Sequence, residues 1–278
     1  MPTIKAGEVD LEYYLEGDGP PLLMVMGFAG QANSWGEPIM SRLRERFTCI
    51  RFSNRGTGAS DRPEAPTTIR MMADDAVALL GALDIKRAHV FGVSMGGMIS
   101  QEIVLNYAGR VNGLVLGCTT PGWSHGETAS AEVTALMAPE PGLSREEQVR
   151  KAWPIICAPA FIEGGADFLE EMLVTSLEQA TPIETLMKQG VAVQAFDSFD
   201  RLSEIRAPTL IIHGDVDRLV PPANGDVLAA GIAGAAKLTL GGAAHMFFWE
   251  QPEKAADAII EFLARPDGRA SARVTAEV

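Results

Sequence analysis

The sequence has few of the features that mark disulfide-rich or membrane-spanning proteins. It contains three cysteines in 278 residues, and none of them stands in a Cys-x-x-Cys pair. An odd number of isolated cysteines favours a reducing, cytoplasmic compartment, and it does not predict a disulfide framework, a metal site or a cofactor. No apolar run approaches the roughly 18 residues that a membrane span needs. The first five residues, Met1 to Lys5, carry no signal-peptide pattern.

Positive charge is also scarce. The chain has 23 Lys and Arg against 36 Asp and Glu, which gives a net charge of −13. Such a surface repels phosphate backbones and anionic lipid, so we expect neither nucleic acid nor a membrane surface as a partner. The hydrophobic content of 47% and the charged content of 21% are typical of a globular protein. No pattern in the sequence indicates the oligomeric state.

Short apolar runs alternate with helical periodicity along most of the chain. The runs that we assign to strands are residues 9–15, 22–26, 47–52, 88–93, 111–118, 209–213 and 237–240. Apolar residues recur at a spacing of three and four over residues 69–83, and further helices are expected at 98–107 and 252–264. This alternation predicts an α/β fold with a mostly parallel sheet and helices on both faces.

The region from 121 to 200 breaks the alternation. Ser144-Arg145-Glu146-Glu147 is a capping box that opens a helix, and helical patterns follow at 168–177 and 183–193. We expect no strand in this region. We interpret it as a helical cap inserted into a core that consists of residues 1–120 and 201–278.

The most informative motif is Gly92-Val93-Ser94-Met95-Gly96, at the junction of an apolar strand and a helix. A serine hydroxyl is a poor nucleophile unless it is exposed and served by a base. A sharp strand-to-helix turn exposes the hydroxyl, and glycines on either side let strand and helix approach each other. The motif arises by chance with a probability of about 0.1, so its position at the junction is what predicts a catalytic nucleophile.

A serine nucleophile needs a base and an acid. His245 follows the last strand after four small residues, and histidine can take and return a proton near neutral pH. The acid is expected just after the preceding strand, where we favour Asp217. Asp215 is the alternative, although an aspartate there often hydrogen-bonds the backbone of the turn. His89 and His213 lie at strand ends and are expected to be structural.

Two backbone N–H groups should face the oxygen that becomes negative in the transition state, and each is worth about 3 kcal/mol. Met95 stands at the start of the helix after Ser94 and supplies one candidate. The loop Gly27-Phe28-Ala29-Gly30 follows the strand at 22–26, and we expect the N–H of Phe28 to be the second.

These residues resemble the α/β-hydrolase superfamily over about residues 8–264. The order Ser94, Asp217, His245, with strand-like runs on both sides of a helical insertion, is typical of that superfamily, in which the insertion follows the sixth of eight strands. The resemblance implies an eight-stranded sheet. It also implies a serine hydrolase that cleaves carboxylic esters, and lactones among them, through an acyl-enzyme on Ser94.

A second segment is similar to a narrower group within the superfamily. Residues 51–61 resemble the Asp-x-Arg-Gly-x-Gly-x-Ser segment of small lidded esterases and 3-oxoadipate enol-lactonase-like proteins, and residues 92–101 and 208–221 match that group as well. The chain departs from the group at Met26, where a histidine is common, and at Asn54, where an aspartate is usual.

The cap is expected to cover an apolar pocket for a small-molecule ester of small to medium size. The candidate wall residues, all apolar or aromatic, are Trp35, Trp123, Met137, Trp153, Phe161, Met172, Met187 and Phe247. His125, in the insertion, is a further candidate for contact with the substrate. Two alternatives stay open: a carbon–carbon hydrolase, lyase or perhydrolase that uses the same three residue types, and a ligand-sensing relative with low turnover.

Overall fold

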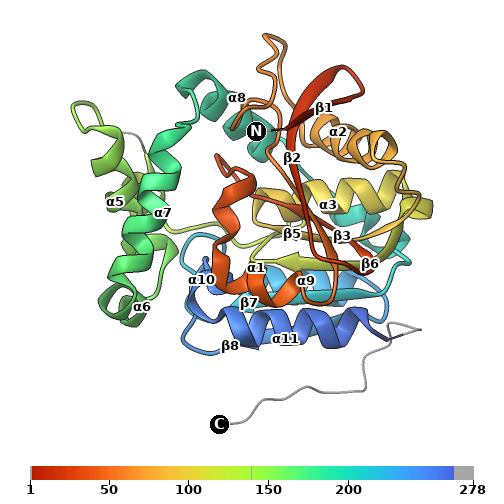
Figure 1. Ribbon diagram of the computed structural model, residues 1–278. Helices are drawn as coiled ribbons and strands as arrows, with labels where there is room; N and C mark the ends of the chain where they lie inside the picture. The colour runs from red at the N-terminus through yellow and green to blue at the C-terminus, as the bar shows by residue number, and fades with distance from the viewer. Residues whose placement is uncertain (1, 139, 266–278) are drawn as a thin grey trace.

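The computed structural model describes residues 2–138 and 140–265, which contain one sheet of eight strands (Figure 1). The strands are β1 (Thr3–Ala6), β2 (Val9–Glu16), β3 (Pro21–Val25), β4 (Thr48–Phe52), β5 (Ala88–Val93), β6 (Val111–Gly117), β7 (Thr209–Gly214) and β8 (Ala236–Leu240). Their order is β1-β2-β4-β3-β5-β6-β7-β8. β2 pairs antiparallel with both β1 and β4, and all other neighbours are parallel. The predicted fold class is confirmed.

Successive residues of the central strands pack on opposite faces of the sheet. Leu23 and Val25 of β3 belong to one apolar cluster, whereas Leu22 and Met24 belong to the other, and all four are fully buried. This arrangement explains why the strand consists of consecutive apolar residues. β1 was not predicted, because it has four residues and buries only one of them fully, so it contains no apolar run.

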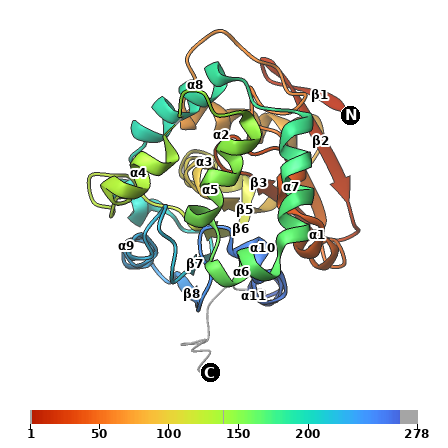
Figure 2. The ribbon, with the colours of Figure 1, turned by 90° about the vertical axis from the view of Figure 1, so that its left-hand side faces the viewer.

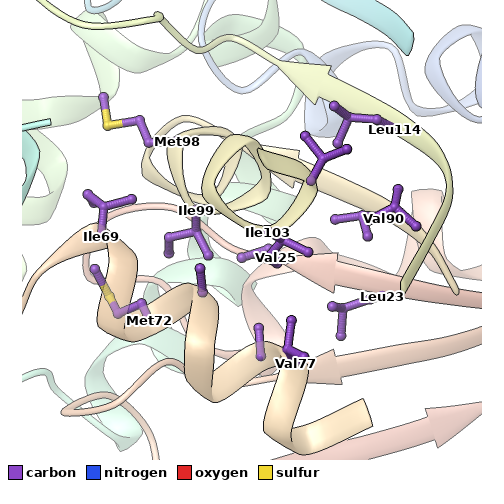
Figure 3. Packing of buried hydrophobic residues seen from close by; sticks show 14 of the residues in the cluster. Leu23, Val25, Ile69, Met72, Val77, Val90, Met98, Ile99, Ile103 and Leu114 are labelled. Atoms are coloured by element: carbon purple, nitrogen blue, oxygen red, sulfur yellow. The ribbon is translucent and has the colours of Figure 1, made fainter. Parts of the chain in front are cut away.

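Helices cover both faces, as expected. They are α1 (Glu37–Leu43), α2 (Ile69–Ala82), α3 (Met95–Asn106), α9 (Ala223–Gly231), α10 (Phe247–Glu250) and α11 (Pro252–Leu263). Figure 3 shows Val77 of α2 and Ile103 of α3 near Leu23, Val25 and Val90 of the strands, in one buried cluster. α1, α10 and α11 pack on the other face. α3 begins at Met95, as the Ser94 motif predicts, and before the periodic pattern at 98–107, because the glycines of its first turn carry no apolar periodicity.

The described residues between β6 and β7 form helices and no strand of the main sheet. These helices are α4 (Ala131–Met137), α5 (Arg145–Ile156), α6 (Pro159–Gly164), α7 (Ala166–Glu178) and α8 (Ile183–Gln194). Figure 2 shows α5 and α7 in front of β5 and β6. The predicted capping box at Ser144 is present, because Ser144 and Glu147 each accept from the other's backbone N–H. None of the described helices is long and apolar enough to cross a membrane.

The two ends of this insertion meet at the core. Gly122 and Asp197 form an isolated antiparallel bridge, and the N–H of Ser198 donates to the carbonyl of Pro121 over 2.7 Å. We propose that residues 121–200 are a cap that enters and leaves the core at this bridge.

Candidate active site

Ser94 lies at a sharp turn between β5 and α3. Its backbone angles are φ 55° and ψ −123°, a conformation that costs a residue with a side chain about 1–3 kcal/mol. Hydrogen bonds on both sides maintain the turn: the N–H of Ser94 donates to Gly117 over 2.9 Å, and the hydroxyl of Thr119 donates to the Ser94 carbonyl over 2.7 Å. The side chain is only half-buried, so the hydroxyl is accessible.

Close packing around this turn requires glycine at two positions. A Cβ on Gly96 would lie 2.0 Å from the carbonyl oxygen of Val25, and a Cβ on Gly92 would lie 2.2 Å from the carbonyl oxygen of Gly96. Both distances are far below a van der Waals contact. The glycines therefore let α3 approach β3 and β5, as the motif predicts.

Asp217 and His245 come together at the ends of neighbouring strands. Nδ1 of His245 lies 2.8 Å from Oδ2 of Asp217, and both side chains are almost completely buried. An ionised carboxylate only accepts, so Nδ1–H donates and Nε2 is the nitrogen left for other partners. Asp215 is exposed and accepts from the N–H of Gly242 over 2.7 Å. Asp215 therefore binds the backbone of the turn, as an aspartate at this position often does.

The carboxylate of Asp217 has further donors. Oδ1 accepts from the N–H groups of Leu219 and Val220, over 2.9 and 3.0 Å. Oδ2 also lies 3.5 Å from Nε2 of His213, a fully buried imidazole that donates to the Val220 carbonyl over 2.8 Å. Burial alone would raise the pKa of Asp217, but the two imidazoles lower it to about 2. The acid is therefore ionised throughout the physiological range.

The groups around His245 determine its pKa. Burial alone would lower its pKa, but the charge of Asp217 outweighs burial and raises the pKa well above 6.5. The neighbouring thiol of Cys118 raises the pKa of the imidazole further. Glu250 faces the same region, with its carboxylate on the N–H of Ala244, and burial raises its pKa.

Cys118 is a site residue that the sequence analysis missed. It follows β6 as Ser94 follows β5, and those two parallel strands are neighbours, so their carboxyl ends lie side by side. Burial raises the pKa of its thiol. The backbone of Ser94 and the imidazole of His245 both act to lower that pKa, so the thiol lies beside both groups. Among the described residues, the Ser94 hydroxyl makes no hydrogen bond to His245, and a change of χ1 rotamer is the motion that moves the hydroxyl.

The loop after β3 passes directly over Ser94. A Cβ on Gly27 would lie 3.0 Å from the Cβ of Ser94 and 3.6 Å from its hydroxyl oxygen, so the loop and the serine are in close contact. The loop closes as a turn in which the N–H of Gly30 donates to the carbonyl of Gly27 over 3.2 Å. Within the described part of the chain, the N–H groups of Phe28 and Met95 donate to no other residue. Both are free to serve as the predicted oxyanion donors.

The eight predicted wall residues lie in different environments. Trp35 and Phe247 are completely buried in the apolar cluster beneath the site, where the Trp35 ring lies 4.9 Å from that of Phe91. The structure places these two in the core rather than in a pocket wall, because their apolar rings fill the space between the sheet and the helices of that face. Met172 is buried within the cap.

The remaining candidates lie at the surface of the cap or along its border with the core. Trp123 donates its indole N–H to the Val193 carbonyl over 2.9 Å, and Trp153 stacks under a guanidinium. Met137 is 37% exposed and Met187 is 67% exposed. Phe161 packs edge-on against a neighbouring cap ring. Contact of these residues with substrate stays a prediction, as it does for His125, which is exposed and stacked on a phenyl ring.

Two cavities in the structure lie away from these residues. One, of about 80 Å³, lies between α8 and the segment around Arg55, and the other, of about 330 Å³, lies beside Arg87 and His89. Neither is lined by Ser94 or His245. Among the described residues, no three His, Cys, Asp or Glu side chains are grouped as metal ligands would be.

Comparisons with known proteins show which proteins this chain is similar to. A model of the alpha/beta hydrolase fold family matches residues 20–141. The chain is 30% identical over 272 residues to a protein of Azorhizobium caulinodans that is named as a carbamate hydrolase, RutD, and the match covers 96% of this chain and all of the relative.

Two further relatives carry the name enol-lactonase. The chain is 28% identical to 3-oxoadipate enol-lactonase 2 of Acinetobacter baylyi, over 90% of this chain and 92% of that one. The crystal structure of the enol-lactonase from Burkholderia xenovorans LB400 superposes with a TM-score of 0.83 and 23% identity, over 95% of this chain and all of that one.

Proposed function

We propose that this chain, which belongs to the α/β-hydrolase family, is a serine hydrolase that cleaves carboxylic esters, lactones included. The observation that carries the proposal is the hydrogen bond of 2.8 Å between the ring of His245 and the carboxylate of Asp217, beside a strained turn that presents Ser94. Nucleophile, base and acid of this kind are the parts that acyl transfer needs.

The reaction gives each of these residues a role once a change of χ1 brings the Ser94 hydroxyl to the imidazole. Nε2 of His245 accepts the proton of the Ser94 hydroxyl while the serine oxygen bonds to the ester carbonyl carbon. Asp217 stabilises the imidazolium, and the N–H groups of Phe28 and Met95 bind the negative oxygen. His245 then gives its proton to the departing alcohol as the carbon–oxygen bond breaks. A water molecule, deprotonated by His245, releases the acid and regenerates Ser94.

Uncharged, apolar substrates fit the cap best. The cap exposes large apolar side chains, among them Met137, Val174 and Met187, and Phe28 beside the site is 46% exposed. The net charge of −13 disfavours anionic substrates at long range. We therefore expect apolar acyl or alcohol groups of small to medium size.

Carbamate hydrolysis is the second candidate, favoured by the relative that matches at 30% identity over its whole length. The same attack on the carbonyl carbon of a carbamate ester would expel its alcohol, with the proton supplied by His245, and would leave a carbamoyl group on Ser94, which water then releases as carbamic acid. A panel of p-nitrophenyl esters, lactones of increasing ring size and small carbamates separates the two. Faster turnover of the carbamates than of every ester would favour the second candidate.

The proposal is tested by Ser94→Ala and by covalent labelling. A fluorophosphonate should label the parent protein on Ser94 with time, and Ser94→Ala should lose both labelling and ester turnover while keeping its thermal unfolding midpoint. Ester turnover by Ser94→Ala at the parent rate would refute the proposal. Fast turnover of vinylogous diketones, cyanohydrins or peracids beside no ester turnover would assign one of the alternative reactions of this fold.

A further inference from the structure

The cap holds one residue of the loop over Ser94 from both sides of its backbone. The N–H of Ala29 donates to Oε1 of Gln189 over 2.8 Å, and the hydroxyl of Thr181 donates to the Ala29 carbonyl over 3.1 Å. Gln189 belongs to α8, and Thr181 lies just before that helix. Gln189 is completely buried and Thr181 is 3% exposed, so both side chains are held within the protein.

Ala29 is the residue of this loop that needs support. It has a φ of 58°, and it is the third residue of the turn that Gly27 and Gly30 close. The third position of a turn with this sign of φ normally carries glycine, because a Cβ disfavours the left-handed region. External hydrogen bonds to the N–H and to the carbonyl of Ala29 fix both of its peptide planes. One of these planes includes the carbonyl of Phe28, next to the proposed oxyanion donor.

The chemistry of Gln189 indicates that the contact has a purpose beyond packing. Its Nε2 is buried without a hydrogen-bond partner among the described residues, so the one bond recorded for this amide is the bond from Ala29. An apolar side chain of the same size would avoid the cost of the unpaired donor. Such a side chain would, however, offer no acceptor to the N–H of Ala29.

We propose that Gln189 and Thr181 are positioning residues that orient the oxyanion loop through Ala29. This inference rests on the proposed serine-hydrolase function. The two side chains keep the N–H of Phe28 directed at the oxygen that becomes negative on the carbonyl or phosphonyl group attached to Ser94. The cap thus takes part in the chemical step even for substrates too small to touch it.

The chain offers a matched control for the test. Thr181 and Thr185 are both buried cap threonines that donate to a carbonyl of the core, to Ala29 over 3.1 Å and to Gly56 over 3.2 Å. Replacement of each by valine removes one bond of the same kind and keeps the shape. Only the bond of Thr181 reaches the oxyanion loop.

The experiment measures the rate of fluorophosphonate labelling of Ser94 and the kcat and KM for a short p-nitrophenyl ester. In labelling, the serine oxygen bonds to phosphorus, its proton passes to His245, fluoride leaves, and the phosphonyl oxygen occupies the oxyanion site. Loss of a whole oxyanion donor costs about 10²–10³ in rate, so partial misorientation should cost less. We expect Thr181→Val and Gln189→Met to slow labelling and kcat about tenfold each, with KM within twofold. Thr185→Val should match the parent in both rates.

Every outcome of this experiment either supports or overturns the positioning role of Gln189 and Thr181. Equal labelling rates for Thr181→Val and Thr185→Val would overturn the inference, as would a rise in KM with unchanged kcat, which would make the contact one of substrate binding. If Gln189→Met fails to fold, the threonine pair still gives the answer, and Gln189→Glu, which keeps the acceptor, should label faster than Gln189→Met. A parent protein that is not labelled at Ser94 would refute the proposed function and this inference with it. If the parent is labelled at Ser94 and the cap variants are labelled at the parent rate, the inference is refuted and the proposed function stands.

Discussion

Replacement of Asp217 by asparagine tests how the acid controls the imidazole. The carboxylate accepts two backbone N–H groups on Oδ1 and the His245 ring on Oδ2. An asparagine amide keeps its oxygen on the two backbone donors, because its NH₂ group cannot accept from them. The NH₂ group then faces Nδ1 of His245 and donates to it.

This reversal moves the imidazole proton to Nε2, where it blocks acceptance of the Ser94 proton. In serine hydrolases a wrong tautomer of this kind lowers kcat by about 10⁴-fold, which corresponds to about 5.5 kcal/mol in the activation free energy. We therefore expect Asp217→Asn to retain about 10⁻⁴ of the parent kcat with little change in KM. Without the charge that raises it, the pKa of His245 should also fall, since burial lowers it.

The assay is kcat and kcat/KM for a p-nitrophenyl ester from pH 5 to 9, with a thermal unfolding scan of each protein. Asp215→Asn is the matched control, because Asp215 lies two residues away, is exposed and bonds only the turn. It should stay within about twofold of the parent, as surface substitutions usually do. More than a tenth of the parent activity in Asp217→Asn, or the larger loss in Asp215→Asn, would refute the assignment of the acid.

Three further predictions concern the surroundings of the site. Because the pKa of His245 is raised and the base must be neutral, kcat/KM should rise with pH through a midpoint above 6.5. The raised pKa also contributes to the free energy of unfolding, and this contribution is complete below about pH 6.5. It is lost as pH rises through the folded-state pKa. Iodoacetamide should modify Cys118 at least about a hundredfold more slowly in the native protein than in urea, since the thiol is buried and burial raises its pKa; equal rates would contradict the structure. Gly96→Ala should destabilise the fold by about 3 kcal/mol or prevent folding, because the new methyl group would lie 2.0 Å from the Val25 carbonyl oxygen, and an unchanged midpoint in urea unfolding would show that α3 can move away.

Much of the fold was predictable because its signals are local. Strands buried on both faces, such as β3, are consecutive apolar residues, and the helix α2 shows its buried stripe in the sequence. β1 carries no such run, because it is a short edge strand with one buried residue. The apolar periodicity of α3 starts later than the helix itself, because the glycines of the first turn are required by a close approach to a strand about 70 residues earlier in the chain.

The candidate site also contains residues that the sequence reveals and residues that it does not. Ser94 has a motif of its own, and His245 and Asp217 can be inferred from their positions after neighbouring strands. Cys118 has no motif, and its contact with His245 appears only when the order of β5, β6 and β7 is known. Trp35 and Phe247 looked like wall residues because a large aromatic side chain suits a pocket and a core equally well. Their neighbours in space, which the sequence does not reveal, place them in the core.

The bridge between Gly122 and Asp197 has an evolutionary consequence. Since the chain departs from the sheet and rejoins it at adjacent points, an insertion of different length or sequence can be exchanged there without altering the order of the strands. Where residues 121–200 cover the site as we propose, a lineage can acquire new substrate preferences by replacing this one segment. The bonds from Gln189 and Thr181 to Ala29 would limit that freedom, because a transplanted module must still present two polar groups to the same peptide units.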